Sequence, residues 1–184
     1  TTHWIMEGSA ESGATLVVCG TTEEVMAEAE RIRGWGEAAE RWARDPVNQP
    51  TISNWVEAMG NDNPRWREGE APPSMAQVWT MYGQGGKAPA DDPLHAMMGV
   101  LTEAGFTAVL GTNCEQEYLR TLRVGEQVRV TTALDSVVGP KRTGMGVGYF
   151  VTSRNIWYVG DEYVASMLFR HLKFVPRSRE GGGA

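Results

Sequence analysis

The sequence predicts an α+β domain in which helices come first and an antiparallel sheet follows. Helical spacing and helix-starting residues dominate as far as Gly105, whereas the chain from Phe106 onward alternates between apolar and polar residues as strands do. The run Val159-Gly160-Asp161-Glu162 has the composition of a tight hairpin turn. Helices followed by hairpin-linked strands are typical of α+β proteins.

The composition limits both the size and the class of the protein. A chain of 184 residues with 41% hydrophobic residues is enough for one domain with a real core and a short appendage. The net charge of −6 argues against a nucleic-acid partner. No stretch approaches the roughly 20 apolar residues of a membrane span, so no membrane partner is expected and the cytoplasm is the simplest location. Cys19 and Cys114 have no metal spacing; a disulfide is formally open, and two thiols are the commoner interpretation.

The first expected helix begins with a capping box, because Thr21 and Glu24 stand three residues apart. Its apolar residues recur at helical spacing, and the helix is expected to run to about Ala43. The sequence Arg44-Asp45-Pro46 should end it, since the residue before a proline is disfavoured in a helix.

Three further helices are expected before the sheet. Ser53 can cap a second helix that stops at Gly60. Two prolines start a third helix, Met75 to Tyr82, and Pro93 starts a fourth. The side chains expected to face inward from the second helix are Trp55, Val56 and Met59, and those from the fourth are Leu94, Met97, Met98 and Leu101.

The strands of the second half are predicted from alternation and composition. Val128, Val130 and Leu134 alternate with polar residues, and Thr132 completes the row. Residues 148–159 are rich in β-branched and aromatic side chains, and residues 163–175 form the last expected strand.

Residues 60–66, Gly-Asn-Asp-Asn-Pro-Arg-Trp, follow the short apolar helix and are the most informative stretch of the chain. Together with that helix they resemble the hydratase motif of the MaoC-like hot-dog family, an apolar helix followed by G-D-x-N-P-x-H. In that family the Asp and the His form the acid/base pair that adds water to a 2-enoyl-CoA. Here Asn61 stands at the Asp position and Trp66 stands at the His position.

Other stretches carry the same resemblance in the same order. Ala71-Pro72-Pro73-Ser74-Met75 resembles the APxxM start of the central hot-dog helix, and Arg123-Val124-Gly125-Glu126 resembles the strand that follows in MaoC-like hydratases. The resemblance implies a single hot-dog fold, an antiparallel sheet wrapped around a central helix, with an extra N-terminal helix. The expected divisions are a tag remnant or frayed terminus over 1–20, a helical extension over 21–44, the hot-dog domain over 45–176, and a flexible tail over 177–184.

Within the family, the runs 44–48 and 52–57 and the triplet Trp79-Thr80-Met81 are most similar to the non-catalytic MaoC-domain subunit of actinobacterial heteromeric hydratases. These enzymes act on steroid side-chain CoA thioesters. The likeness implies a heterodimer, or a dimer of heterodimers, with a second hot-dog subunit that has an intact motif. It also points to a C-terminal DUF35 domain after residue 184 and to a thiolase-like aldolase as further partners.

The substituted motif cannot perform the family's chemistry unaided. Hydration of a conjugated thioester needs a base for water and an acid for the α-carbon. Asn61 has no usable pKa, and the Trp66 indole offers only an N–H donor, so we expect Trp66 to fill the unused slot. No other titratable group is expected to replace the missing pair. Asp62 and Glu57 are expected to be solvated carboxylates, and His95 a surface or helix-capping residue. His171 is expected to be a structural histidine, and His3 belongs to the frayed terminus.

The resemblance makes CoA thioesters the expected ligand, with no separate cofactor and no metal. The phosphates of CoA favour Arg and Lys, and the best basic candidate is the loop 139–144, whose glycines would let backbone N–H groups approach a phosphate. A solvated hairpin loop is the plainer interpretation of the same residues. The predicted substrate and CoA contacts are Asn63, Met75, Lys141, Arg142 and Gly144.

Two other functions remain open at this point. A hot-dog thioesterase usually needs a carboxylate on or near the central helix, and 75–82 contains none. A non-enzymatic acyl-CoA binding module would bind the ligand without turnover. The sequence separates this last possibility poorly from a hydratase subunit.

Overall fold

The computed structural model describes residues 20–177. The predictions for the first 19 residues, including His3 and Cys19, and for the tail after Arg177 lie outside the described residues. The helices and strands, in chain order, are α1 (Thr22–Arg33), β1 (Ala38–Trp42), α2 (Gln49–Ala58), η1 (Pro64–Arg67), β2 (Glu70–Ala71), η2 (Pro73–Met75), η3 (Val78–Thr80), α3 (Pro93–Glu103), β3 (Ala108–Tyr118), β4 (Leu122–Arg123), β5 (Val128–Arg142), β6 (Gly146–Val159) and β7 (Glu162–Pro176).

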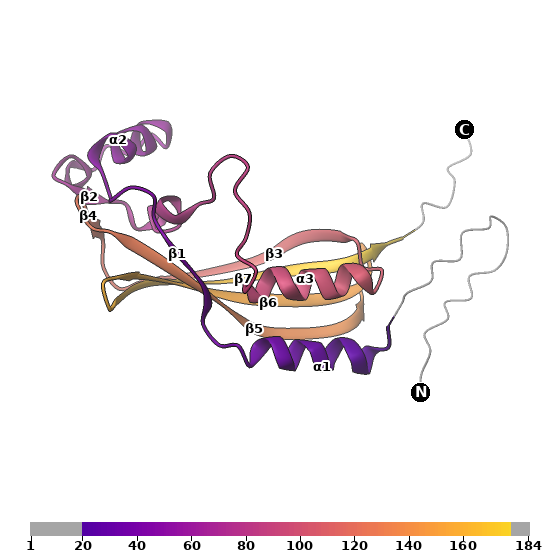
Figure 1. The fold of residues 1–184 in the computed structure, drawn as a ribbon. Helices are drawn as coiled ribbons and strands as arrows, with labels where there is room; N and C mark the ends of the chain where they lie inside the picture. The colour runs from indigo at the N-terminus through magenta and orange to yellow at the C-terminus, as the bar shows by residue number, and fades with distance from the viewer. Residues whose placement is uncertain (1–19, 178–184) are drawn as a thin grey trace, which may run out of the picture.

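One antiparallel sheet of five strands, in the order β1-β5-β6-β7-β3, forms the body of the protein (Figure 1). The predicted β6–β7 hairpin is confirmed, and Gly160 at its turn has φ of 58°, which favours glycine. The predicted row on β5 is also confirmed, because Val128, Val130, Thr132 and Leu134 are all buried. Alternation at period two therefore located both the strand and its buried face.

The two edges of this sheet differ in length and regularity. β3 is 11 residues long and pairs with β7 along its whole length, with one register shift near Gly111. β1 is five residues long, pairs with β5 around a register shift, and contains Ala39 at φ of 53°. The sheet thus has one long edge and one short, irregular edge.

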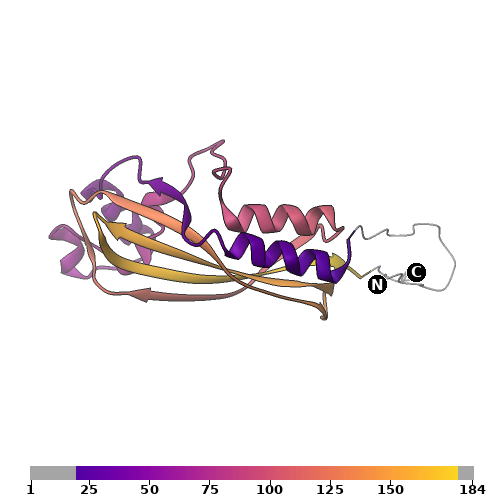
Figure 2. The same cartoon turned by 60° about the horizontal axis from the view of Figure 1, so that its bottom comes forward.

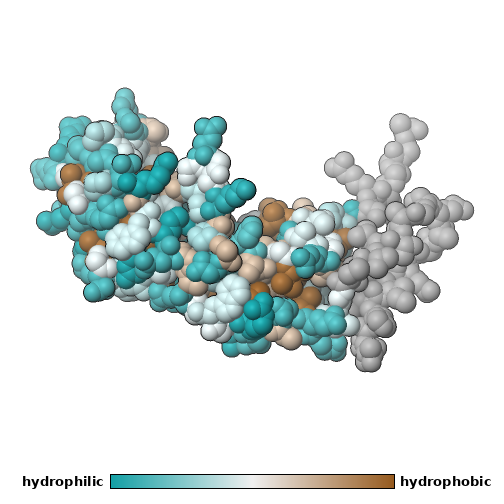
Figure 3. Space-filling model, in the orientation of Figure 1, coloured by the Kyte–Doolittle hydropathy of each residue, from teal (hydrophilic) through white to brown (hydrophobic). Residues whose placement is uncertain are grey.

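Helices α1 and α3 lie side by side on one face of the sheet (Figure 2). α1 packs on β5, and α3 packs on β5 and β6. Ile32 of α1 and Met97 and Leu101 of α3 are fully buried in the same cluster as Tyr149 and Val151 of β6. Figure 3 shows hydrophobic side chains gathered near α3, whereas hydrophilic residues dominate the end that carries α2.

A second cluster lies at that other end, where α2, η1 and the small β2–β4 ribbon close over the sheet. Its centre contains Ile52 of α2, Trp66 of η1 and Met75 of η2, together with Trp79 and Trp157. The Trp157 Nε1–H donates to Thr80 Oγ1 at 2.9 Å, and both residues are buried. Trp79 and Trp157 are therefore core residues.

The end of the first helix was predicted wrongly. The capping box is confirmed, since Glu24 N donates to Thr21 Oγ1 and Thr21 N donates to Glu24 Oε2. However, α1 ends at Arg33, and 38–42 form β1 instead of continuing the helix to Ala43. Gly34 caps the helix and Gly36 has φ of 66°, so the two glycines break the helix completely.

Of the next three predicted helices, the second and third need correction and the fourth is confirmed. Asn48, not Ser53, caps α2, and its last expected inward residue, Met59, is 66% exposed. Residues 75–82 form no α-helix: η2 and η3 are single 3-10 turns, and the helices that pack on the sheet are α1 and α3. α3 confirms the prediction from Pro93, with Met97 and Leu101 buried.

The predicted loop 139–144 is largely strand, because β5 continues to Arg142 and only Thr143 to Met145 form the turn to β6. A Cβ at Gly139 would lie 2.7 Å from Tyr149 Cδ1. That glycine therefore allows close packing between strands rather than access to a phosphate.

Candidate functional site

The two substituted motif positions contact each other. The Trp66 Nε1–H donates a hydrogen bond to Asn61 Oδ1 at 3.1 Å. Gly60, with φ of 61°, turns the chain after α2, and Asn61 N donates to Val56 O at 2.8 Å, which fixes Asn61 at the helix end. Trp66 is only 7% exposed and belongs to the second core cluster. Trp66 is thus packed among core side chains, and that it fills the unused hydratase slot stays a prediction.

The rest of the motif loop is bonded within itself. Asn63 N donates to Asn61 Oδ1, and Asn63 Oδ1 accepts from Arg65 N at 3.1 Å as the cap of η1. Gln49 Nε2 of α2 donates to Trp66 O at 2.7 Å, which ties η1 to the first turn of α2. The structure therefore places the predicted contact residue Asn63 on the exposed surface, where its side chain acts as a cap.

The other predicted contacts do not gather at this loop. Met75 is fully buried beside Trp66 in the core. Lys141, Arg142 and Gly144 lie at the far end of the β5–β6 hairpin, at the opposite end of the sheet from α2 (Figure 1). β5 has 15 residues between these ends, which is about 45 Å at ~3.3 Å per residue. One CoA phosphate cannot reach both groups of residues.

The candidate replacement acids and bases are dispersed. Asp62 and Glu57 are exposed beside the motif loop. His95 is exposed in the first turn of α3, where its backbone N–H donates to Asp92 Oδ1. His171 lies on β7, edge-on to the Phe169 ring with centroids 4.3 Å apart, and burial lowers its pKa. No described residue completes an acid/base pair with Asn61 or Trp66.

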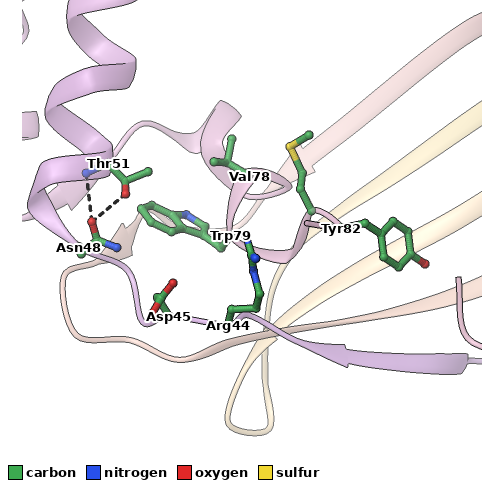
Figure 4. Close-up of a pocket in the computed structure, with 8 residues that line it drawn as sticks. Arg44, Asp45, Asn48, Thr51, Val78, Trp79 and Tyr82 are labelled. Carbon is green, nitrogen blue, oxygen red and sulfur yellow. Dashed lines mark hydrogen bonds between the residues drawn. The ribbon is translucent and has the colours of Figure 1, made fainter. Parts of the chain in front are cut away.

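A cavity of about 180 Å³ lies between the first turn of α2 and η3 (Figure 4). Asn48 and Thr51 form one wall, and the Thr51 hydroxyl donates to Asn48 Oδ1 at 2.7 Å. Trp79 lies between this wall and Arg44 in the view of Figure 4, and Tyr82 lies beyond the end of η3. The cavity is close to the motif loop, because Gln49, next to Asn48, is the residue that bonds to Trp66.

Two guanidinium groups lie beside this cavity. Arg44 lines it, and Arg41 lies over the Tyr82 ring with Cζ 4.0 Å from the centroid while Nε donates to Thr80 O at 2.7 Å. Residues 44–46 carry a helix-stop signal and residues 44–48 carry part of the family resemblance, but neither pattern marks Arg41 or Arg44 as a site residue. Their spacing of three residues was visible, but nothing in the sequence placed them against Tyr82 and Gly83.

The described residues contain no group of three or more His, Cys, Asp or Glu side chains arranged to hold a metal ion. Within the same part of the chain, no helix is both long and apolar enough to cross a membrane. Cys114 is a free, exposed thiol on β3.

Known proteins similar to this chain include two curated hydratase subunits. The chain is 48% identical over 157 residues to the 3-oxo-4,17-pregnadiene-20-carboxyl-CoA hydratase alpha subunit of Mycobacterium tuberculosis, covering 79% of this chain and 50% of that protein. It is 35% identical over 155 residues to a probable enoyl-CoA hydratase alpha subunit of Thermomonospora curvata, covering 76% and 49%. The chain spans about half the length of these curated relatives.

Solved structures agree on the fold. A chain of the ChsH1–ChsH2 complex from M. tuberculosis superposes with a TM-score of 0.81 at 44% identity, covering 87% of this chain and 96% of that one. A MaoC-like dehydratase from Phytophthora capsici superposes with a TM-score of 0.51 at 16% identity, over 80% and 49%, which supports the hot-dog fold alone. The family described as the FAS1-like dehydratase domain region matches residues 21–167. The chain therefore belongs to the FAS1-like dehydratase family, whose domains have the MaoC-like hot-dog fold.

Proposed function

We propose that this chain is the non-catalytic hot-dog subunit of a heteromeric 2-enoyl-CoA hydratase that acts on a bulky, steroid side-chain CoA thioester. A second hot-dog subunit with an intact motif supplies the Asp and the His. Support comes from the names of the two curated relatives, both alpha subunits of hydratases, and from the complex in which the similar solved chain is found. A DUF35 domain and a thiolase-like aldolase stay predictions.

The observation that carries the proposal is the contact between Asn61 and Trp66. Water addition needs groups that exchange protons near neutral pH, and an amide bonded to an indole N–H provides none. The indole is also packed in the core, which supports a motif position filled by protein rather than left open to substrate. A subunit with this arrangement can shape a binding site but cannot transfer the protons of hydration.

The long edge of the sheet supports a hot-dog partner. β3 bonds to β7 on one side only, and nearly all of its side chains are exposed. A long exposed edge strand is a template for pairing with another chain. Val109 and Leu110 on this strand are 57% and 44% exposed, which adds apolar surface for a partner to cover. We infer that the partner's sheet joins here and that the ligand lies between the two halves.

The proposal is tested by reconstitution. The purified chain is mixed with steroid-type 2-enoyl-CoA, and loss of the conjugated thioester is followed by absorbance, with and without a partner subunit that has the intact motif. We expect hydration only when both are present, and none when the partner's motif Asp is replaced by Asn. Full hydration by this chain alone would overturn the proposal. Release of free CoA would instead favour a thioesterase, and binding without turnover with any partner would favour a binding module.

A further inference from the structure

We propose that the cavity beside Arg44 binds a phosphate oxyanion of the CoA part of the ligand. This inference rests on the proposed function for the identity of the ligand, and it assigns the phosphate contact to Arg44 and Arg41 on β1 and its following loop. It places that contact at the α2 end of the sheet, not at Lys141 and Arg142.

The cavity is large enough for one small chemical group of a ligand but not for a whole ligand. Sites that enclose drug-sized molecules measure roughly 300–1,000 Å³, whereas this cavity measures about 180 Å³. A steroid skeleton or a complete CoA does not fit in it. A phosphate with its ester oxygen does fit, and the rest of the ligand can leave through the open side.

The Arg44 guanidinium is positioned by backbone and not by a carboxylate. A Cβ built on Gly83 would lie 2.6 Å from Arg44 Nη1, so the guanidinium rests directly against this glycine. Among residues 20–177, no ion pair or side-chain hydrogen bond includes Arg44. Arg44 is an exposed residue that touches Gly83 and keeps its donors free, which suits the planar recognition of an oxyanion.

Arg41 adds a second positive charge against the Tyr82 ring. Its guanidinium lies over the ring and has no carboxylate partner within the described part of the chain. Burial raises the pKa of Tyr82, so its hydroxyl adds no negative charge at neutral pH.

Two carboxylates also belong to this region. Asp45 lines the cavity. Asp92 is buried, accepts from His95 N at the start of α3, and lies close enough to the Tyr82 hydroxyl to add to the rise of its pKa that burial causes. Arg41 and Arg44 are therefore accompanied by Asp92 and Asp45, and the phosphate contact rests on the free guanidinium donors of Arg44 rather than on an excess of positive charge.

Equilibrium titration of the chain, assembled with its hydratase partner, tests the inference. The probes are CoA, dephospho-CoA, inorganic phosphate and pantetheine. We expect CoA to bind more tightly than pantetheine and its affinity to fall as salt is raised. Arg44→Gln should weaken CoA binding about tenfold or more and leave pantetheine binding unchanged. Dephospho-CoA separates the 3′-phosphate from the pyrophosphate as the bound group, and inorganic phosphate shows whether the site takes a free anion.

A second variant tests the geometry without changing charge. Gly83→Ala should displace the guanidinium and weaken CoA binding in the same direction as Arg44→Gln. Arg33→Gln, which removes an arginine from an exposed ion pair on α1, is the matched control. Circular dichroism and thermal unfolding check that each variant is folded.

The inference is overturned if Arg44→Gln and Gly83→Ala bind CoA as tightly as the unchanged protein. It is also overturned if the phosphate-dependent part of CoA affinity is lost in a Lys141→Gln/Arg142→Gln variant and kept in Arg44→Gln. Hydration with the partner is measured separately on the same preparations. If the protein with its partner hydrates the substrate but Arg44→Gln leaves CoA affinity unaltered, only the inference is refuted. If hydration is absent but CoA binding depends on its phosphates and on Arg44, only the proposed function is refuted.

Discussion

Restoring the missing acid/base residues should not restore an independent enzyme. The double variant Asn61→Asp/Trp66→His recreates the family motif in sequence. In the structure, however, Trp66 is a buried member of the α2-end core and not a side chain facing an open slot. We therefore expect a destabilised protein with weak hydratase activity at most.

The destabilisation can be worked from the contacts of Trp66. Truncating a buried Trp to Ala costs about 3–5 kcal/mol, and an imidazole refills roughly half of that volume, which leaves about 2 kcal/mol. Loss of the indole N–H bond to Asn61 adds about 1 kcal/mol. A new Asp–His pair at exposed Asn61 returns less than about 1 kcal/mol. The net loss of about 2–3 kcal/mol is a large part of a typical stability of about 5–15 kcal/mol.

Urea unfolding, thermal unfolding and a hydration assay on the same preparation measure these effects. The melting temperature should fall by about 5–10 °C, since 1 kcal/mol shifts it by about 2–4 °C at this size. The Asn61→Asp single variant is the control and should unfold nearly as the original does, because a carboxylate still accepts the indole N–H. Robust hydration by the double variant alone, or a loss below about 0.5 kcal/mol, would refute the reasoning.

Three further outcomes follow from individual contacts. Asn48→Ala should lower stability by about 1 kcal/mol in urea unfolding, because Asn48 Oδ1 caps α2 by accepting from Thr51 N; Ser53→Ala should change little. Thr80→Val should cost about 1–3 kcal/mol by leaving the buried Trp157 Nε1–H without its acceptor, and an unchanged urea midpoint would contradict that bond. Burial lowers the pKa of His171, so the unfolded chain binds the proton more readily; stability is complete above the unfolded pKa of 6.5 and falls as pH drops through it toward the folded value. His171→Phe should flatten this acid-side loss in urea midpoints between pH 7.5 and 5, and an identical slope in both proteins would disprove it.

The sequence correctly predicted the helix starts and the turn whose signals lie within a few neighbouring residues. The capping box at Thr21, the helix from Pro93 and the turn at Gly160 depend on neighbouring residues, and each is present. The strand β1 was missed because its residues, Ala-Ala-Glu-Arg-Trp, have helical composition. They become a strand because β5 offers an edge to which they pair, and that edge is invisible in a local window.

The sequence predicted those features of the candidate site that depend on residue type. It did not predict the features that depend on where the residues lie in space. The residues at Asn61 and Trp66 showed directly that proton-transfer groups are absent. The 3-10 turns after Pro73 were not predictable from propensity, because tertiary contacts such as the Trp157–Thr80 bond hold the chain there. The separation between Lys141 and the motif loop depends on the length of β5, which composition had divided into a strand and a loop.

The unlike edges of the sheet limit how far assembly can proceed. A sheet that offers two long, regular edges can add strands from both sides and grow without end. Here β1 offers only five residues with an irregular register, whereas β3 offers 11. A chain of this design can join one other sheet and then has no comparable edge left. Association through backbone pairing should therefore stop at a closed pair and not continue into a fibre.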